Sequence, residues 1–586
     1  MRRTLVPLCA LALLATGGVT ACGGPDQPDT VAQEFADAVN RDDVAAAAGL
    51  TSDPAAASAT LSQMLDALGT EMTMTVASTN RDAETFTLGV DWQLDAGNRK
   101  WAYTTDGAAT EAGDAWKITW SPSLLAPGLT ADEKVALATL YPQPSARVTD
   151  RTGADLLTDQ VVTLVNVDAT ADPGLVAPLL ATVVPTITAD SLSADLAAAG
   201  GQSVTAITLR QSDIDPIRPA LAALPGVTLA DQNRLLTADR ALASPTWNDL
   251  ATLWQQAHDA SAGWVVQAVA PDGSARRLTG QDPVPASDIT TTLDPALQRN
   301  AEAALAPLTQ PATIVALQPS TGDVLAIAQN AAADAEGPSA LTGLYPPGST
   351  FKVVTTAAAL ASGQVNPDTV LPCPGSADIE GRTIPNDDNF DLGQVPLHTA
   401  FARSCNTTFG RLAVGMAPTA LTDAAAQFGL GIDYTIPGLT TVTGSVPTAD
   451  TPALRVEAGI GQGQVTASPF GMALVAATVA HGGVPTPTMV TGQPGIGDRQ
   501  PPALPAGITD ALRPMMRETV ATGTAAALAD VGDLIGKTGT AEAGEATHGW
   551  FVGVRGDLAF AVFVADAGTS QPAIDAAGRF IRAPRV

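Results

Sequence analysis

The sequence predicts a multidomain protein of the α+β class, with a helix-and-strand front region and a larger region of mixed helices and strands behind it. Its 586 residues are long enough for about three or four domains. Apolar residues alternate with polar ones from Met72 to Trp120, which is typical of half-buried antiparallel strands. Later segments mix strand and helix patterns. The net charge is -29, and the sequence contains no long run of basic residues that could follow a phosphate backbone. Nucleic acid is therefore not expected as a partner.

The amino terminus has the pattern of an export signal. Arg2-Arg3 precedes an apolar run from Leu5 to Ala15, which is too short to span a bilayer about 30 Å thick comfortably. Val19-Thr20-Ala21-Cys22 then resembles a bacterial lipobox, which implies a signal peptide of residues 1–22 and a diacylated Cys22. We therefore expect a lipid anchor on the extracytoplasmic face of the cell membrane. An uncleaved transmembrane anchor is the alternative.

Residues 26–140 form the expected front domain. Val31 to Leu50 reads as an amphipathic helix or helix pair. Four period-two segments follow, with their apolar residues at Met72, Met74, Val76; Phe86, Leu88, Val90, Trp92; Trp101, Tyr103; and Trp116, Ile118, Trp120. Helices followed by a curled meander resemble the cone-shaped, nuclear-transport-factor-like domain of methicillin-resistance-type penicillin-binding proteins. A role as a spacer is favoured over a ligand site.

Two further signatures divide the rest of the chain. Arg147 to Gly153 is similar to the signature that opens the linker domain of class B penicillin-binding proteins, although Val148 stands where that family usually has glycine. Thr292 to Glu302 is similar to the first helix of the transpeptidase domain in the same family. The resemblance implies a linker or dimerisation domain over 141–287 and a transpeptidase domain over 288–586.

Three short motifs carry the chemistry. They are Ser349-x-x-Lys352, Ser404-Cys405-Asn406 and Lys537-Thr538-Gly539-Thr540, and Lys352 and Lys537 are the only lysines after position 300. Ser349 begins a predicted helix, and Lys352 follows by about one turn, so both side chains leave the same face. A hydroxyl nucleophile beside an amine base requires this spacing. Each motif is weak alone, but their order is specific.

The triplet resembles the serine transpeptidase domain of class B penicillin-binding proteins, which implies an antiparallel sheet with helices on both faces. The resemblance makes Ser349 the nucleophile, Lys352 the base and Ser404 a proton relay. It implies that Asn406 holds the Lys352 amine and the substrate amide. The edge strand would bind the peptide carboxylate through Lys537 and Thr538, let the substrate approach at Gly539, and complete an oxyanion hole at Thr540.

The implied activity is that of a D,D-transpeptidase that cross-links peptidoglycan stem peptides and is acylated by β-lactams, without a metal or cofactor. Cell-division or elongation proteins are possible partners. A D,D-carboxypeptidase, a β-lactamase and a non-catalytic β-lactam sensor or scaffold are the alternatives. A class A β-lactamase would need a glutamate soon after Asn406, and none occurs before Glu457. A sensor would need a cytoplasmic signalling part, which the sequence lacks.

The remaining candidates are cysteines, a glycine-rich loop and two histidines. After Cys9 and Cys22, only Cys373 and Cys405 remain, and an exported protein favours a disulfide between them, with two free thiols as the alternative. The resemblance implies that Cys405 points away from the cleft. Gly461-Gln462-Gly463 is expected to be a structural loop behind the site. His398 and His548 lack the sequence partners of a triad or metal site.

Overall fold

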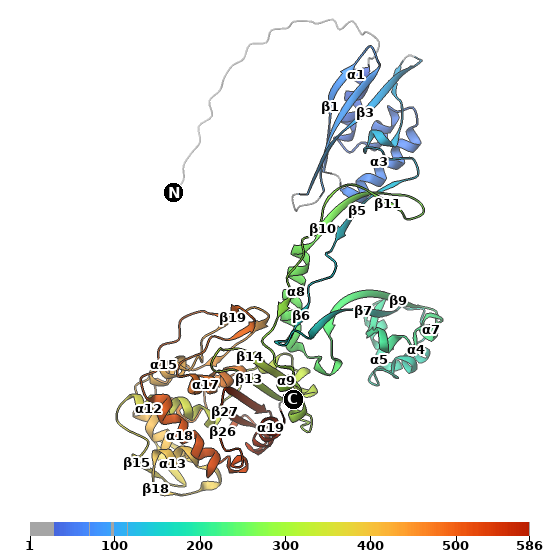
Figure 1. Cartoon of the computed structure of the whole chain (residues 1–586). Helices are drawn as coiled ribbons and strands as arrows, with labels where there is room; N and C mark the ends of the chain where they lie inside the picture. The colour runs from blue at the N-terminus through green and yellow to red at the C-terminus, as the bar shows by residue number, and fades with distance from the viewer. Residues whose placement is uncertain (1–27, 70, 95–98, 114, 585–586) are drawn as a thin grey trace, which may run out of the picture. The chain divides into compact units, whose positions relative to one another are not determined.

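The computed structural model describes residues 28–69, 71–94, 99–113 and 115–584. The chain divides into two compact units. The first comprises residues up to Ser145 together with 259–285, and the second comprises 146–258 together with 286–586. Figure 1 shows the chain from blue at its amino terminus to red at its carboxyl terminus. Within the described residues, no helix is both long and apolar enough to cross a membrane.

The first unit packs a curled sheet against three helices. These are α1 (Pro28–Val39), α2 (Val44–Gly49) and α3 (Pro54–Leu68), so the expected helix pair over 31–50 is present. The antiparallel sheet has the order β1 (Met72–Asn80), β2 (Thr85–Gln93), β3 (Lys100–Ala112) and β4 (Ala115–Ile118). The alternating residues of β2, Phe86, Leu88, Val90 and Trp92, are buried in the core shared with the helices.

A second sheet of this unit corrects the expected extent of the linker domain. β5 (Lys134–Leu140) pairs along its whole length with β10 (Gly263–Val269), which also pairs with β11 (Ala275–Gln281). Val266 and Ala268 of β10 are buried in the core of the front unit. The chain therefore returns to its first unit between residues 259 and 285, where β10 pairs with β5.

The linker part of the second unit is built on two long strands. β7 (Asp155–Val167) and β9 (Val227–Thr237) pair antiparallel over eleven residues, and β8 (Val204–Arg210) pairs with the other edge of β7. Short helices, α4 (Pro173–Leu180), α5 (Ala189–Ala198), α6 (Gln211–Ile214) and α7 (Arg218–Ala222), share a small apolar core with these strands (Figure 1). β6 (Val148–Thr149) pairs with β12 (Ile289–Thr290), close to where the catalytic part begins.

The catalytic part is a five-stranded antiparallel sheet covered on both faces. Its order is β14 (Val324–Gln329), β13 (Ala312–Leu317), β28 (Leu558–Val564), β27 (Ala546–Arg555) and β26 (Leu534–Ala543). One face packs on α17 (Pro469–His481), and the other packs on α9 (Pro295–Leu305) and α19 (Gln571–Arg582). Because both faces are buried, the inner strand β28 is apolar on both sides. The strand β26 lies at one edge of the sheet.

Candidate active site

The nucleophile candidate Ser349 lies in a 3₁₀ turn, η4 (Gly348–Phe351), that runs directly into α12 (Lys352–Ala361). The turn is pressed between two backbones. A Cβ atom at Gly348 would come within 2.3 Å of the Thr540 carbonyl oxygen on β26, and the Gly348 N–H donates to the Gly461 carbonyl at 2.9 Å. Only glycine permits this approach, so the turn and the edge strand are held together.

Lys352 is fully buried, and its ammonium faces the second motif. Nζ donates to the Ser404 carbonyl at 2.7 Å and to Asn406 Oδ1 at 2.7 Å, and it lies 3.2 Å from Ser404 Oγ. Burial, and then the charge of Lys537, hold the pKa of Lys352 well below its ordinary value, while Asp387 acts in the opposite direction. The lowered pKa favours the free amine, which is the form that a general base requires.

Lys537 of β26 approaches the same hydroxyl from the other side. Its Nζ donates to Ser404 Oγ at 3.0 Å and to the Thr538 carbonyl at 2.9 Å. The side chain is fully buried, and this burial lowers the pKa of Lys537 to about 7. Ser404 thus lies between the two lysines, which is the place that the family resemblance implies for a relay.

Ser404 is held by an unusual backbone and a covalent bond next to it. Its φ of 62° lies in the left-handed region, which is rare for serine and is found where the surrounding structure imposes it. The Cys405 N–H donates to the Ala400 carbonyl at 2.8 Å, and Cys405 is joined to Cys373 by a disulfide. Cys405 is fully buried away from the cleft.

Asn386 links the disulfide to the start of α14 (Asn406–Val414). Its Nδ2 donates to the carbonyls of Pro374 and Phe390, each at 2.9 Å, and its Oδ1 accepts from the Thr407 N–H at 3.2 Å. Asn406 Nδ2 in turn donates to the Pro385 carbonyl at 3.0 Å. The segment around 385–390 is therefore one wall of the site, fixed to the Ser404 motif by side-chain amides.

The three motifs open on one cleft of about 1230 Å³. Its walls include predicted residues from all three motifs, namely Ser349, Ser404, Asn406, Thr538 and Thr540. Lys352 and Lys537 are buried beneath the walls, and Gly539 packs behind them, where a Cβ atom would lie 2.9 Å from the Pro347 carbonyl. An extended peptide can reach the edge of β26 along this cleft.

Sequence reasoning missed several residues of the cleft. Thr524 Oγ1 lies 2.6 Å from Thr538 Oγ1, so the two hydroxyls can orient each other toward a bound carboxylate. Arg382 and Glu457 form an ion pair across the cleft wall. Thr524, Arg382 and Glu457 belong to none of the three motifs. Thr524 and Thr538 are 14 positions apart in the sequence, and Arg382 and Glu457 are 75 positions apart. Only the fold brings them together.

The other candidates lie apart from the three motifs. His398 pairs with Glu518 at 2.6 Å, and His548 accepts from the Asp566 N–H at 3.2 Å and packs edge-on to Tyr345. Burial lowers the pKa of His548. Among the described residues, no group of histidine, cysteine and carboxylate side chains could hold a metal ion. The lipobox residue Cys22 lies outside the described residues.

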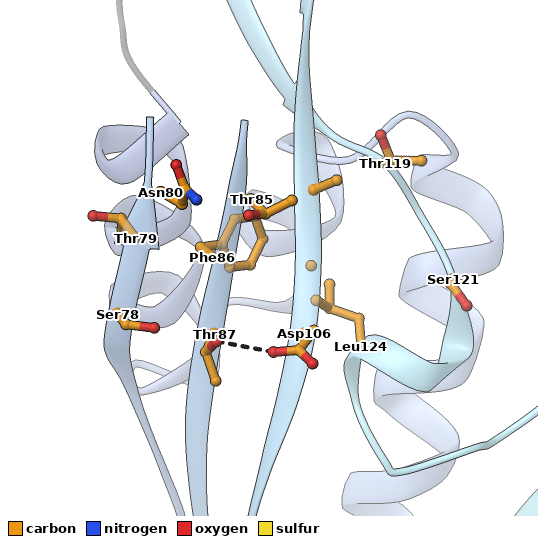
Figure 2. A pocket seen from close by; sticks show the side chains of 12 residues that line it. Ser78, Thr79, Asn80, Thr85, Phe86, Thr87, Asp106, Thr119, Ser121 and Leu124 are labelled. Carbon is orange, nitrogen blue, oxygen red and sulfur yellow. Dashed lines mark hydrogen bonds between the residues drawn. The ribbon is translucent and has the colours of Figure 1, made fainter. Parts of the chain in front are cut away.

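The front unit has a smaller cavity of about 630 Å³ at the sheet. Figure 2 shows hydroxyl side chains from β1 and β2, together with Thr119 and Ser121, around it. Asp106 accepts a hydrogen bond from Thr87 Oγ1 at 2.9 Å, and Phe86 is buried in the core. Phe86 is the aromatic residue among the described residues that line the cavity, and it is buried.

Comparison with known proteins places this site in a family. The model of the penicillin binding protein transpeptidase domain matches residues 312–584, and the model of the NTF2-like N-terminal transpeptidase domain matches residues 27–133. The peptidoglycan D,D-transpeptidase PbpA of Mycolicibacterium smegmatis is 32% identical over 370 residues, which are 52% of this chain and 72% of the relative. The chain belongs to the penicillin-binding D,D-transpeptidase family.

A second curated relative is similar in sequence, and one solved structure is similar in fold. PbpA of Mycobacterium tuberculosis is 33% identical over 261 residues, which cover 36% of this chain and about half (52%) of that relative. The penicillin-binding protein PBP2 in a Helicobacter pylori complex with MreC has a TM-score of 0.56 at 16% identity, covering 76% of this chain and 98% of that one. The latter likeness concerns the fold alone.

Proposed function

We propose that the protein is a D,D-transpeptidase that cross-links peptidoglycan stem peptides through an acyl-enzyme on Ser349. The observation that carries the proposal is the position of Ser404 Oγ, 3.2 Å from Lys352 Nζ and 3.0 Å from Lys537 Nζ. Both amines have a lowered pKa, so a proton can pass along this row near neutral pH. The cleft that contains Ser349 and Ser404 also borders the edge strand β26, on which a peptide can be bound.

In the acylation step, Ser349 Oγ attacks the carbonyl carbon of the penultimate D-alanine, and Lys352 accepts the hydroxyl proton. The oxyanion is stabilised by the backbone N–H groups of Ser349 and Thr540, and each such donor contributes about 10² to 10³ in rate. The C–N bond to the terminal D-alanine then breaks. Ser404, which lies 3.2 Å from Lys352 Nζ, passes the proton that Lys352 holds to the leaving nitrogen, so that Lys352 is again a free amine.

In the second step, an amine of a neighbouring stem peptide attacks the acyl carbon and releases Ser349. Lys352 takes the amine proton and returns it to the departing Ser349 Oγ, so that the free amine and the serine hydroxyl of the starting state are restored. The terminal carboxylate of the donor is bound by Lys537 and Thr538, and the hydroxyl of Thr524, 2.6 Å from that of Thr538, helps to orient it. A β-lactam acylates the same serine because its strained amide mimics the donor.

Two alternatives use the same residues. A D,D-carboxypeptidase would let water instead of an amine attack the acyl-enzyme. A β-lactamase would need a base for deacylation, and the first glutamate after the Ser-x-Asn motif, Glu457, is paired with Arg382 in the cleft wall. This pairing favours a long-lived acyl-enzyme over rapid hydrolysis.

The proposed location is the extracytoplasmic face of the cell membrane, with a lipid on Cys22 as the anchor. Two acyl chains hold a protein stably at a membrane, so a diacylated cysteine suffices. Cys22→Ala should leave an unprocessed, unlipidated precursor, and normal processing of this variant would contradict the lipoprotein assignment. Because the H. pylori relative was solved with MreC, a cell-shape protein is the proposed type of partner.

Labelling with penicillin tests the nucleophile. The full-length protein should gain one adduct by intact mass, and Ser349→Ala should abolish it. The exposed Ser445, on the short strand β21 (Gly444–Ser445), provides a matched control, and Ser445→Ala should be labelled normally. An adduct that persists in Ser349→Ala would show that another residue is acylated.

A further inference from the structure

The edge of β26 is already occupied at one position by a side chain. The amide of Gln462 lies against the backbone of Glu542: its nitrogen donates to the Glu542 carbonyl at 3.1 Å, and its oxygen accepts from the Glu542 N–H at 2.9 Å. This orientation of the amide is the one that satisfies both groups. A single side chain therefore makes the two hydrogen bonds that a paired strand residue would make.

The position of this contact relative to the site follows from strand geometry. Alternate residues of a strand direct their backbone groups to the same edge. The Glu542 backbone bonds to Gln462 and the Thr538 carbonyl to Lys537 Nζ, so the backbone groups of Thr538, Thr540 and Glu542 are directed away from β27. Lys537 Nζ donates a hydrogen bond to the Thr538 carbonyl. The Gln462 amide is bonded to the backbone of Glu542, which lies two residues, or roughly 7 Å, beyond Thr540 along the strand. One residue, Thr540, is left between these two contacts for a donor peptide.

Gln462 is held rigidly in this place. Its own N–H donates to the Glu457 carbonyl at 2.9 Å, at the end of α16 (Pro452–Gly459). The flanking Gly461 and Gly463 have φ values of 73° and 70°, and Gly461 is fixed to the nucleophile turn through the hydrogen bond from Gly348. The side chain is thus part of the framework that carries Ser349, and it does not lie on a free loop.

The cleft itself continues beyond this point. Glu542, Gly544 and Ser570 also line it, so a longer donor has room, but the Glu542 backbone is already bonded to Gln462. We propose that Gln462 is a specificity-determining residue that limits the donor peptide to one residue of strand pairing, at Thr540. Donors that turn away from β26 after this residue are accepted as well as donors with a continuous extended backbone.

This inference rests on the proposed acyl-transfer function and is tested with two thioester donors. Both end in the same D-alanyl thioester, and the long one carries two additional L-alanine residues in an extended backbone. In the wild-type full-length protein, the ratio of kcat/KM for acylation, long over short, should be close to one. In Gln462→Ala the ratio should rise roughly fivefold, because the freed Glu542 backbone can add hydrogen bonds to the long donor alone.

Gln462→Asn is a second variant, since its shorter side chain cannot reach Glu542, and it should shift the ratio in the same direction. Gln464→Ala removes an exposed glutamine two residues away and should leave the ratio at the wild-type value. A ratio that stays at the wild-type value in Gln462→Ala would overturn the proposal, whether or not both rates fall. A residue with only a structural role would lower the rates with the two donors equally.

Hydrogen exchange gives a measurement that does not depend on turnover. The Glu542 amide should exchange faster in Gln462→Ala than in the wild type or Gln464→Ala, and unchanged exchange would overturn the contact. The two failures remain distinguishable. If neither donor acylates Ser349 in the wild type, the proposed function has failed. If both donors acylate it and the ratio is insensitive to Gln462, only the present inference has failed.

Discussion

At the scale of single residues, the site depends on two buried lysines. Among the described residues, neither forms an ion pair with a carboxylate, although the charge of Asp387 partly offsets the lowering of the Lys352 pKa. Burial disfavours the charged form, and the neighbouring cation adds to this effect at Lys352. Each unit of pKa depression corresponds to about 1.4 kcal/mol. The partners of Lys352 are carbonyl and amide oxygens and the Ser404 hydroxyl, so the ammonium is solvated by the protein but not neutralised by it.

The pH dependence of acylation follows from these two amines. Lys352 accepts a proton only as the free amine, so the rate of penicillin acylation should rise with pH to a plateau. Lys537→Met keeps the volume of the side chain and removes a charge that lowers the pKa of Lys352. The rising limb should therefore move to higher pH in this variant. A limb that stays in place or moves to lower pH in the acylation profile would contradict the electrostatic coupling.

At the scale of elements, glycines allow three segments to meet behind Ser349. A Cβ atom at Gly461 would come within 2.1 Å of the Gly348 carbonyl oxygen, and one at Gly348 would come within 2.3 Å of the Thr540 carbonyl oxygen. The Gly-Gln-Gly loop therefore supports the nucleophile turn from one side while the edge strand supports it from the other.

Gly461→Ala tests this support. Both the left-handed φ of 73° and the collision with Gly348 should destabilise the protein, by about 2 kcal/mol or more, and the displaced turn should slow acylation at least tenfold. Gly482 is a matched control, because its φ is 92° and nothing lies within 4 Å of its Cβ position. Gly482→Ala should lower the melting temperature modestly and leave acylation unchanged. Equal acylation in the two variants would refute the role of the loop.

The Cys373–Cys405 disulfide also holds two elements together, beside the Ser404 motif. Its formation in the protein in solution remains a prediction. The bond spans 32 positions and, by the loop-entropy argument, should contribute about 3 to 4 kcal/mol to stability. Peptide mapping of freshly isolated protein after alkylation without reductant should find the two cysteines linked. Recovery of both as alkylated thiols would rule the bond out.

At the scale of the whole molecule, the chain leaves its front unit at Ser145 and returns to it between 259 and 285. The sequence was enough to predict the features that depend on local periodicity or a short signature. These are the motifs, the front meander, the β13–β14 hairpin and the three strands from residue 534 onward. The pairing of β5 with β10 could not be predicted, since the two strands are more than 120 residues apart. The contacts of Gln462 with Glu542 and of Thr524 with Thr538 depend on the fold in the same way.

This return predicts that residues 28–145 are not a sufficient folding unit. Without β10, β5 loses its partner strand, and the core loses Val266 and Ala268. A fragment of residues 28–145 should unfold at a lower temperature than one in which residues 259–285 are attached through a flexible linker. Circular dichroism melts of the two fragments compare them directly, and equal melting temperatures would show that the returning hairpin is dispensable.

The central claim is that Ser349 forms an acyl-enzyme that an amine resolves. The most direct measurement incubates the full-length protein with a D-alanyl thioester donor and a D-amino acid as the acceptor, and identifies the products by mass. We predict a transient adduct on Ser349 and an aminolysis product that increases with the concentration of the acceptor at the expense of the hydrolysis product. Hydrolysis alone at every acceptor concentration, or turnover that survives in Ser349→Ala, would contradict the account.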